Sequence, residues 1–158
     1  MCAAHKRFAS NIVIAAETST PRLFFRRAQR IGHAREFEAA FAARCSVARG
    51  PLRVHAVLNS TVPPTARLGL SIGRRLGNAV TRHHLKRMLR EVFRLHQHTL
   101  PVGVDFVISA HQHGALTLAQ YAELILPATH QLAARLQARA ARDAEPKPKN
   151  TERGEADA

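Results

Sequence analysis

Acidic side chains are scarce in this sequence, and cysteine, tyrosine and tryptophan are scarcer still. Eleven Asp and Glu residues accompany 24 Lys and Arg residues among 158, which gives a formal net charge of +13. A compact chain with this charge repels itself unless an anionic partner is present. An excess this large, with so few acids, favours a nucleic acid as that partner over a membrane surface.

The low cysteine content excludes two kinds of small domain. Cys2 and Cys45 are the only cysteines, so neither a disulfide framework nor a four-cysteine zinc site can form. The apolar stretch 11–16 is too short for the hydrophobic region of a signal peptide, and no run approaches the length of a membrane span. We therefore expect a cytoplasmic protein with no membrane partner.

The length predicts one domain with irregular ends, because 158 residues bury one ordinary core. Residues 1–21 have no sustained hydrophobic period and are expected to be a flexible N-terminal extension. Residues 143–158 are poor in apolar side chains and are expected to be a disordered tail. The single domain is thus assigned to residues 22–142.

The first half of this domain predicts one helix and two strands. A helix is expected from His33 to about Arg44, since Phe37, Ala40 and Phe41 follow helical spacing. Residues 52–58 and 67–73 alternate between apolar and polar side chains, as half-buried strands do. The face expected to be buried carries Leu52, Val54, Ala56 and Leu58 in the first strand and Leu68, Leu70 and Ile72 in the second. A turn-rich stretch separates the two strands, which are expected to pair as a hairpin.

The second half predicts a long helix, a buried strand and a final helix. The long helix is expected over Asn78–His98, ended by residues 101–103, and residues 104–108 form the apolar run of a buried strand. Thr117 and Gln120 have the spacing of a capping box for the final helix, which continues toward Leu136. Pro127 is expected to kink or split that helix.

The long helix has one apolar and one cationic face. Projection at about 100° per residue places the apolar side chains on one arc and the basic ones on the other. The apolar arc holds Leu85, Met88, Leu89 and Val92, and the cationic arc holds Lys86, Arg87, Arg90 and Arg94. Glu91 is the only acid between Arg67 and His98, so the basic face lacks the alternating carboxylates of a solvated, ion-paired surface. Arg74 and Arg75 extend the positive charge into the preceding loop, and Asn78 stands where it can cap the helix.

The order of residues 77–91, Gly-Asn-Ala-Val-Thr-Arg-His-His-Leu-Lys-Arg-Met-Leu-Arg-Glu, closely resembles the signature of the bacterial ribonuclease P protein component. That family carries Gly-Asn-Ala-Val, then an Arg-Asn-Arg triplet, then Lys-Arg and a further Arg. Arg82 matches the triplet, whereas His83 and His84 replace its usual Asn and Arg. The resemblance extends over about residues 26–139, where helices and strands are expected in the family's order.

The resemblance implies a fold and an activity. The fold is an α/β (α+β) two-layer sandwich, ribosomal-protein-like, with a mixed sheet of about four strands, three helices and a left-handed βαβ crossover. The activity is removal of the 5′ leader from precursor tRNA by a complex whose RNA subunit is the catalyst. The implied partners are ribonuclease P RNA, bound 1:1, and precursor tRNA. The implied cofactor is Mg²⁺, held mainly by RNA, with no organic cofactor, no protein metal site and no catalytic residue in the protein.

The resemblance also assigns two sets of RNA-binding residues. Contact with the catalytic RNA falls to Arg74, Arg75, Asn78, Arg82, His83, Lys86, Arg87 and Arg90. Contact with the single-stranded leader falls to Phe37, Phe41, Arg53 and His55, because aromatic rings stack on bases without reading sequence. Phenylalanine at helical spacing is equally typical of a core, so both roles stay open for Phe37 and Phe41.

Two other functions remain possible from the sequence. A structural, ribosome-associated RNA-binding protein would share the charge, and only the signature helix argues against it. A nuclease could use His83 and His84, or a metal bound by His96, His98, His111 and His113. Adjacent histidines on a helix diverge by about 100°, however, and no carboxylate cluster accompanies them.

Overall fold

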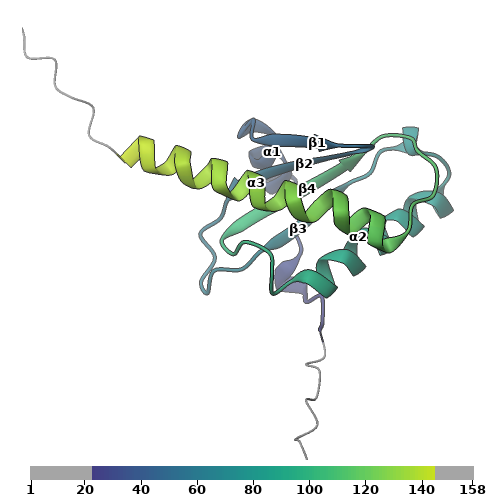
Figure 1. Cartoon of the computed structure of the whole chain (residues 1–158), viewed down its shortest axis with the longest axis horizontal. Helices are drawn as coiled ribbons and strands as arrows, with labels where there is room; N and C mark the ends of the chain where they lie inside the picture. Colours follow the sequence, from purple (N-terminus) through teal and green to yellow (C-terminus); the bar gives the residue numbers. More distant parts are fainter. Residues whose placement is uncertain (1–22, 145–158) are drawn as a thin grey trace, which may run out of the picture.

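The computed structural model describes residues 23–144, which form a four-stranded sheet, three α-helices and two short 3-10 helices (Figure 1). The proposed extension 1–21 and residues 145–158 of the proposed tail lie outside the described residues. In chain order the elements are η1 (Arg27–Gln29), α1 (Ala34–Ala42), β1 (Ser46–Arg49), β2 (Leu52–Leu58), β3 (Arg67–Ser71), η2 (Arg74–Leu76), α2 (Ala79–His96), β4 (Val104–Ala110) and α3 (Leu118–Ala144).

The strands lie in the order β1-β2-β4-β3, with β3 parallel to β4 and the other neighbours antiparallel. Helix α2 connects β3 to β4 and so forms the expected βαβ crossover, and the mixed α+β sheet is confirmed. The predicted hairpin between residues 52–58 and 67–73 is wrong, because β4 lies between β2 and β3. Strand β2 instead forms its hairpin with β1, a strand that the sequence analysis missed, through a turn in which Gly50 has a φ of 53°.

The main core lies between one face of the sheet and helices α2 and α3. Alternate residues of β2 and β4 point into it, and α2 and α3 complete it with apolar side chains spaced three and four residues apart. These residues include Leu52, Val54 and Ala56 from β2, Val104, Phe106 and Ile108 from β4, Leu85, Leu89, Val92 and Phe93 from α2, and Tyr121, Ile125, Ala128 and Leu132 from α3. Leu58 was predicted to face this core but is 47% exposed, because it ends β2 and lines a small hollow open to solvent with Ala43 and Leu136.

Helix α1 covers part of the opposite face of the sheet. Ala40 and Ile31 bury Val107 of β4, so β4 is buried on both faces, as its continuous apolar run predicts. The ring of Phe37 lies over Gly69 of β3: a Cβ added there would come within 2.9 Å of Phe37 Cε1. Glycine at position 69 therefore permits the close approach of α1 to the sheet.

Helix α3 is one continuous element with Pro127 inside it, so of the two predicted effects the split does not occur, and the kink stays a prediction. Buried side chains before and after the proline pack against the sheet: Ile125, Ala128 and Leu132. This packing keeps the segment helical although proline has no N–H donor. The helix also includes Asp143 and Ala144, which the sequence analysis placed in the tail, and its C-terminal turns project beyond the sheet (Figure 1).

Candidate nucleic-acid interface

A fixed cap joins α2 to the basic loop before it. Gly77 adopts a φ of 140°, which side-chain-bearing residues rarely reach, and this directs the chain from η2 into the helix. Asn78 Oδ1 then accepts hydrogen bonds from the Thr81 amide at 2.8 Å and the Thr81 hydroxyl at 2.9 Å. The predicted capping role of Asn78 is confirmed. The cap holds Arg74 and Arg75, both exposed, next to the first turn of α2.

Four of the RNA-binding residues predicted on α2 line two different hollows. His83 and Arg87 line a hollow of about 460 Å³ together with His84 and Val80. Lys86 and Arg90 line another, of about 120 Å³, whose far side carries Phe25, Arg30 and Phe37. Within residues 23–144, no carboxylate pairs with the loop arginines or with the α2 cations Arg82, Lys86, Arg87 and Arg90. Their charge is therefore available to an anionic ligand.

Arg94 does not belong to this surface, contrary to its predicted place on the cationic arc. Its Nε and Nη2 donate to the carboxylate of Glu91 at 2.9 and 2.5 Å, and its Nη1 donates to the carbonyl oxygen of Leu23 at 2.8 Å. The hydrogen bonds from Arg94 hold the pKa of Glu91 below its ordinary value. The row of uncompensated cations along α2 thus ends at Arg90.

Three of the four predicted leader-binding residues meet where α1 crosses β2. The rings of Phe41 and His55 pack edge to face with centroids 4.8 Å apart, and Arg53 is exposed two residues before His55 on the same face of the strand. Burial lowers the pKa of His55, and the charge of Arg53 lowers it further, so the imidazole is neutral at pH 7. Phe41 remains 40% exposed, whereas Phe37 is mostly engaged with Gly69 and Ile31.

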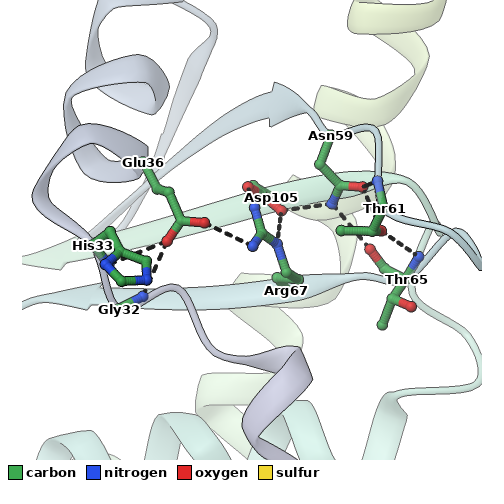
Figure 2. Close-up of polar contacts among 8 residues, drawn as sticks. All are labelled: Gly32, His33, Glu36, Asn59, Thr61, Thr65, Arg67 and Asp105. Atoms are coloured by element: carbon green, nitrogen blue, oxygen red, sulfur yellow. Dashed lines mark hydrogen bonds and ion pairs between the residues drawn. The ribbon is translucent and has the colours of Figure 1, made fainter.

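A polar network that the sequence analysis missed holds the start of α1 against the sheet (Figure 2). Asp105 of β4 is only 3% exposed and is paired with Arg67 of β3 through two hydrogen bonds, one of them 2.7 Å from Nε to Oδ1. Arg67 Nη1 also donates to Glu36 Oε1 of α1 at 2.8 Å. Asn59 Nδ2 supplies a further donor to Asp105 at 2.6 Å. The sequence carried one signal for this network: a lone acid inside an otherwise apolar strand is rarely buried without a partner.

The Glu36 carboxylate is the second anchor of this network. Its Oε2 accepts hydrogen bonds from the backbone amides of Gly32 at 3.2 Å and His33 at 3.1 Å, which caps α1 (Figure 2). Burial alone would raise the pKa of Glu36, but the His33 amide, Arg67 and the Gly32 amide together lower it. Because Glu36 joins the helix cap to Arg67, the position of α1 over the sheet depends on both.

The described residues contain neither a cluster of metal-ligating side chains nor a membrane-spanning helix. Among residues 23–144, no group of three or more His, Cys, Asp or Glu side chains is placed to hold a metal ion, and the histidines proposed for a nuclease form no such group. His113 instead hydrogen-bonds the hydroxyl of Tyr121 at 2.9 Å. No helix in the described part of the chain is long and apolar enough to cross a membrane.

The mixed sheet, the capped cationic helix and the aromatic pair where α1 crosses β2 together define the class: a basic α+β protein with a cationic surface. The chain belongs to the ribonuclease P protein family, because the family model described as Ribonuclease P matches residues 25–136.

Known proteins agree with this assignment. The ribonuclease P protein component of Desulfovibrio desulfuricans is 40% identical over 84 residues, which are 51% of this chain and 65% of that protein. The solved RNase P protein of Staphylococcus aureus superposes with a TM-score of 0.57 at 30% identity, covering 68% of this chain and 96% of the other. That of Thermotoga maritima gives a TM-score of 0.59 at 25% identity, covering 65% and 96%. The expected fold class is thereby confirmed.

Proposed function

We propose that this chain is the protein subunit of ribonuclease P, which binds the catalytic RNA and the 5′ leader of precursor tRNA and assists endonucleolytic removal of that leader. The observation that carries the proposal is the row of α2 and loop cations that have no carboxylate partner among residues 23–144, in a chain whose family is ribonuclease P. The enzyme is the complex, and the cleavage chemistry belongs to its RNA.

The cationic surface supports binding of the catalytic RNA by charge neutralisation. Six side chains each add a positive charge that an RNA phosphate can neutralise, with release of condensed counterions. They are Arg74, Arg75, Arg82, Lys86, Arg87 and Arg90. Arginine also presents a planar fork that contacts phosphate oxygens bidentately. Because the Asn78 cap fixes the loop relative to the helix, these charges are positioned before RNA arrives. His83 and His84 add hydrogen-bonding groups rather than permanent charge.

The face of the sheet under α1 supports binding of the leader. Phe41 and His55 expose ring surface on which a base can stack, and Arg53 lies beside them for the phosphate backbone. Stacking on these rings depends little on base identity, so leaders of different sequence fit the same surface. Phe37 contributes mainly by packing on Gly69, which places α1 and therefore Phe41.

The proposal assigns Mg²⁺ to the RNA, since the described residues contain no carboxylate cluster to hold it. The chain's own residues bind and orient RNA, and none of them transfers a proton in the reaction. A cytoplasmic location and a 1:1 complex with the RNA complete the proposal. A structural RNA-binding protein without a role in tRNA processing is the alternative, and a cleavage assay separates the two.

The decisive experiment mixes the purified full chain with a bacterial ribonuclease P RNA at low Mg²⁺ and measures 5′ cleavage of a precursor tRNA. The chain should stimulate cleavage under conditions where the RNA alone is slow. Arg87→Ala and Arg90→Ala should each weaken assembly and make the plot of log binding constant against log salt less steep by about one. Arg142→Ala, which removes an exposed arginine from the far end of α3, is the control. Absence of stimulation by the wild-type chain would refute the assignment.

A further inference from the structure

We propose that the segment along the outer edge of β3 carries a further binding site for the phosphodiester backbone of RNA, formed by Arg27 and Arg30. The inference rests on the proposed function and adds to it a third contact surface, beyond the α2 cations and the face under α1. It explains two arginines that neither set of predicted residues includes.

The site begins where the α2 cations end. Arg30 forms a parallel bridge with Leu68, and the Ile31 amide donates to the Leu68 carbonyl oxygen at 3.0 Å, so this segment runs along the outer edge of β3. The hollow of about 120 Å³ at this edge has Lys86 and Arg90 on one side and Arg30 on the other. A larger hollow of about 720 Å³ shares Arg30 and Ile31 with it and continues to Arg27 and His33. One basic path therefore leads off α2 and around the start of α1.

Arg30 is held in place without losing its charge. Its guanidinium lies 5.0 Å from the centroid of the Phe25 ring, and its Nη2 donates to the Phe25 carbonyl oxygen at 3.4 Å. Phe25 in turn packs edge to face on Phe93 of α2, with ring centroids 5.4 Å apart. An arginine stacked in this way keeps further N–H donors for a phosphate and sacrifices little side-chain freedom on binding.

The other charged groups that line the larger hollow balance one another. Glu36 accepts hydrogen bonds from two backbone amides and from Arg67, and Arg67 also pairs with the buried Asp105. Arg27 and Arg30 have no carboxylate partner within residues 23–144, so the hollow carries a positive excess. It is lined by no phenyl or phenol ring on which a base could stack. These properties match a phosphate backbone better than a nucleobase.

Two RNA molecules could supply that backbone: the catalytic RNA, continuing from α2, or the leader, continuing past α1. The experiment compares the wild-type chain with the double variant Arg27→Gln, Arg30→Gln, with Arg142→Gln as the matched control. The first arm measures assembly with ribonuclease P RNA as a function of salt. The second arm measures, also as a function of salt, the affinity of the assembled complex for precursor tRNAs. Their leaders have either one or two nucleotides or about ten, and ten lies within the span of a single-strand site.

If the site binds RNA, the double variant should bind RNA more weakly than the wild-type chain. In one arm, the slope of log binding constant against log salt should become less steep by about two. A change in the first arm identifies the catalytic RNA, and a loss confined to the long leader identifies the leader. The variant Arg27→Lys, Arg30→Lys should recover most of the slope, which a purely structural defect would not allow. Unchanged slopes and affinities in both arms, with wild-type stimulation of cleavage intact, would overturn this site alone. A wild-type chain that does not stimulate cleavage would instead overturn the proposed function.

Discussion

Removal of the Arg67 guanidinium tests whether water is excluded from the polar network around Asp105. Arg67→Met keeps most of the side-chain volume but removes the two hydrogen bonds to Asp105 and the one to Glu36. The Asp105 side chain, in a residue only 3% exposed, would then keep Asn59 as its main side-chain donor. Breaking a buried ion pair by removing one partner costs about 3–5 kcal/mol. The Arg67 side chain is 18% exposed and Glu36 is 24% exposed, which places the expected loss near the lower limit, about 3 kcal/mol.

The measurement is urea denaturation of the full chain followed by circular dichroism. With a slope of about 2 kcal/mol per molar urea, a loss of about 3 kcal/mol lowers the unfolding midpoint by about 1.5 M. Arg94→Met is the matched control, because its ion pair with Glu91 is 31% and 39% exposed. A pair of that kind contributes at most about 1 kcal/mol.

A second variant shows that charge, not shape, causes the loss. Adding Asp105→Asn to Arg67→Met removes the unpaired carboxylate, so the double variant should be more stable than Arg67→Met alone. The reasoning is refuted if Arg67→Met costs no more than Arg94→Met, since water would then be reaching Asp105 in solution.

Three further predictions concern single positions. Gly69→Ala places a Cβ 2.9 Å from the Phe37 ring and should destabilise the fold by about 1–3 kcal/mol. Gly73→Ala places its Cβ where no atom lies within 4 Å and should not destabilise the fold. Thermal melts of the two variants compare them directly. Asn78→Ala removes the cap of α2 and should cost about 1 kcal/mol in chemical denaturation, and a wild-type midpoint would show that the cap is dispensable. Because the folded pKa of His55 lies below its ordinary 6.5, the unfolded chain binds this proton first as the pH falls. The free energy of unfolding should therefore decrease as the pH falls from 6.5 through the folded pKa of His55. In His55→Phe this contribution to the pH dependence should be absent when unfolding is followed from about pH 7.5 to 5.

The sequence predicted single elements well where several local signals agreed. Helix α2 combined a hydrophobic period with a capping residue, and its observed bounds Ala79–His96 fall inside the predicted range. The apolar run of β4 correctly predicted burial on both faces. Strand pairing was not predictable in this way, because alternation tells which face of a strand is buried but not which strand lies beside it. The wrong hairpin followed from assuming that neighbours in sequence are neighbours in the sheet.

The candidate site was predictable in its composition but not in its limits. The signature identified the cations of α2, but it does not show that Arg94 is paired with Glu91 and also donates a hydrogen bond to the Leu23 carbonyl, 71 residues away in the chain. Arg30 gained its place through the bridge to Leu68, and Arg67 through β4. Contacts between distant segments place Arg30 and Arg67, and no local sequence pattern records those contacts.

Strand β3 sets the spacing between the two proposed RNA surfaces. Arg67 at its start fixes α1 through Glu36, and the loop with Arg74 and Arg75 follows closely after its end at Ser71. Five residues of extended chain span about 17 Å, and hydrogen bonds to β4 along their whole length prevent that distance from changing. In the proposed function β3 is thus a rigid spacer between the surface for the catalytic RNA and the surface for the leader. An inserted residue would turn the side chains on one side of it to the opposite face of the sheet and so disrupt that spacing.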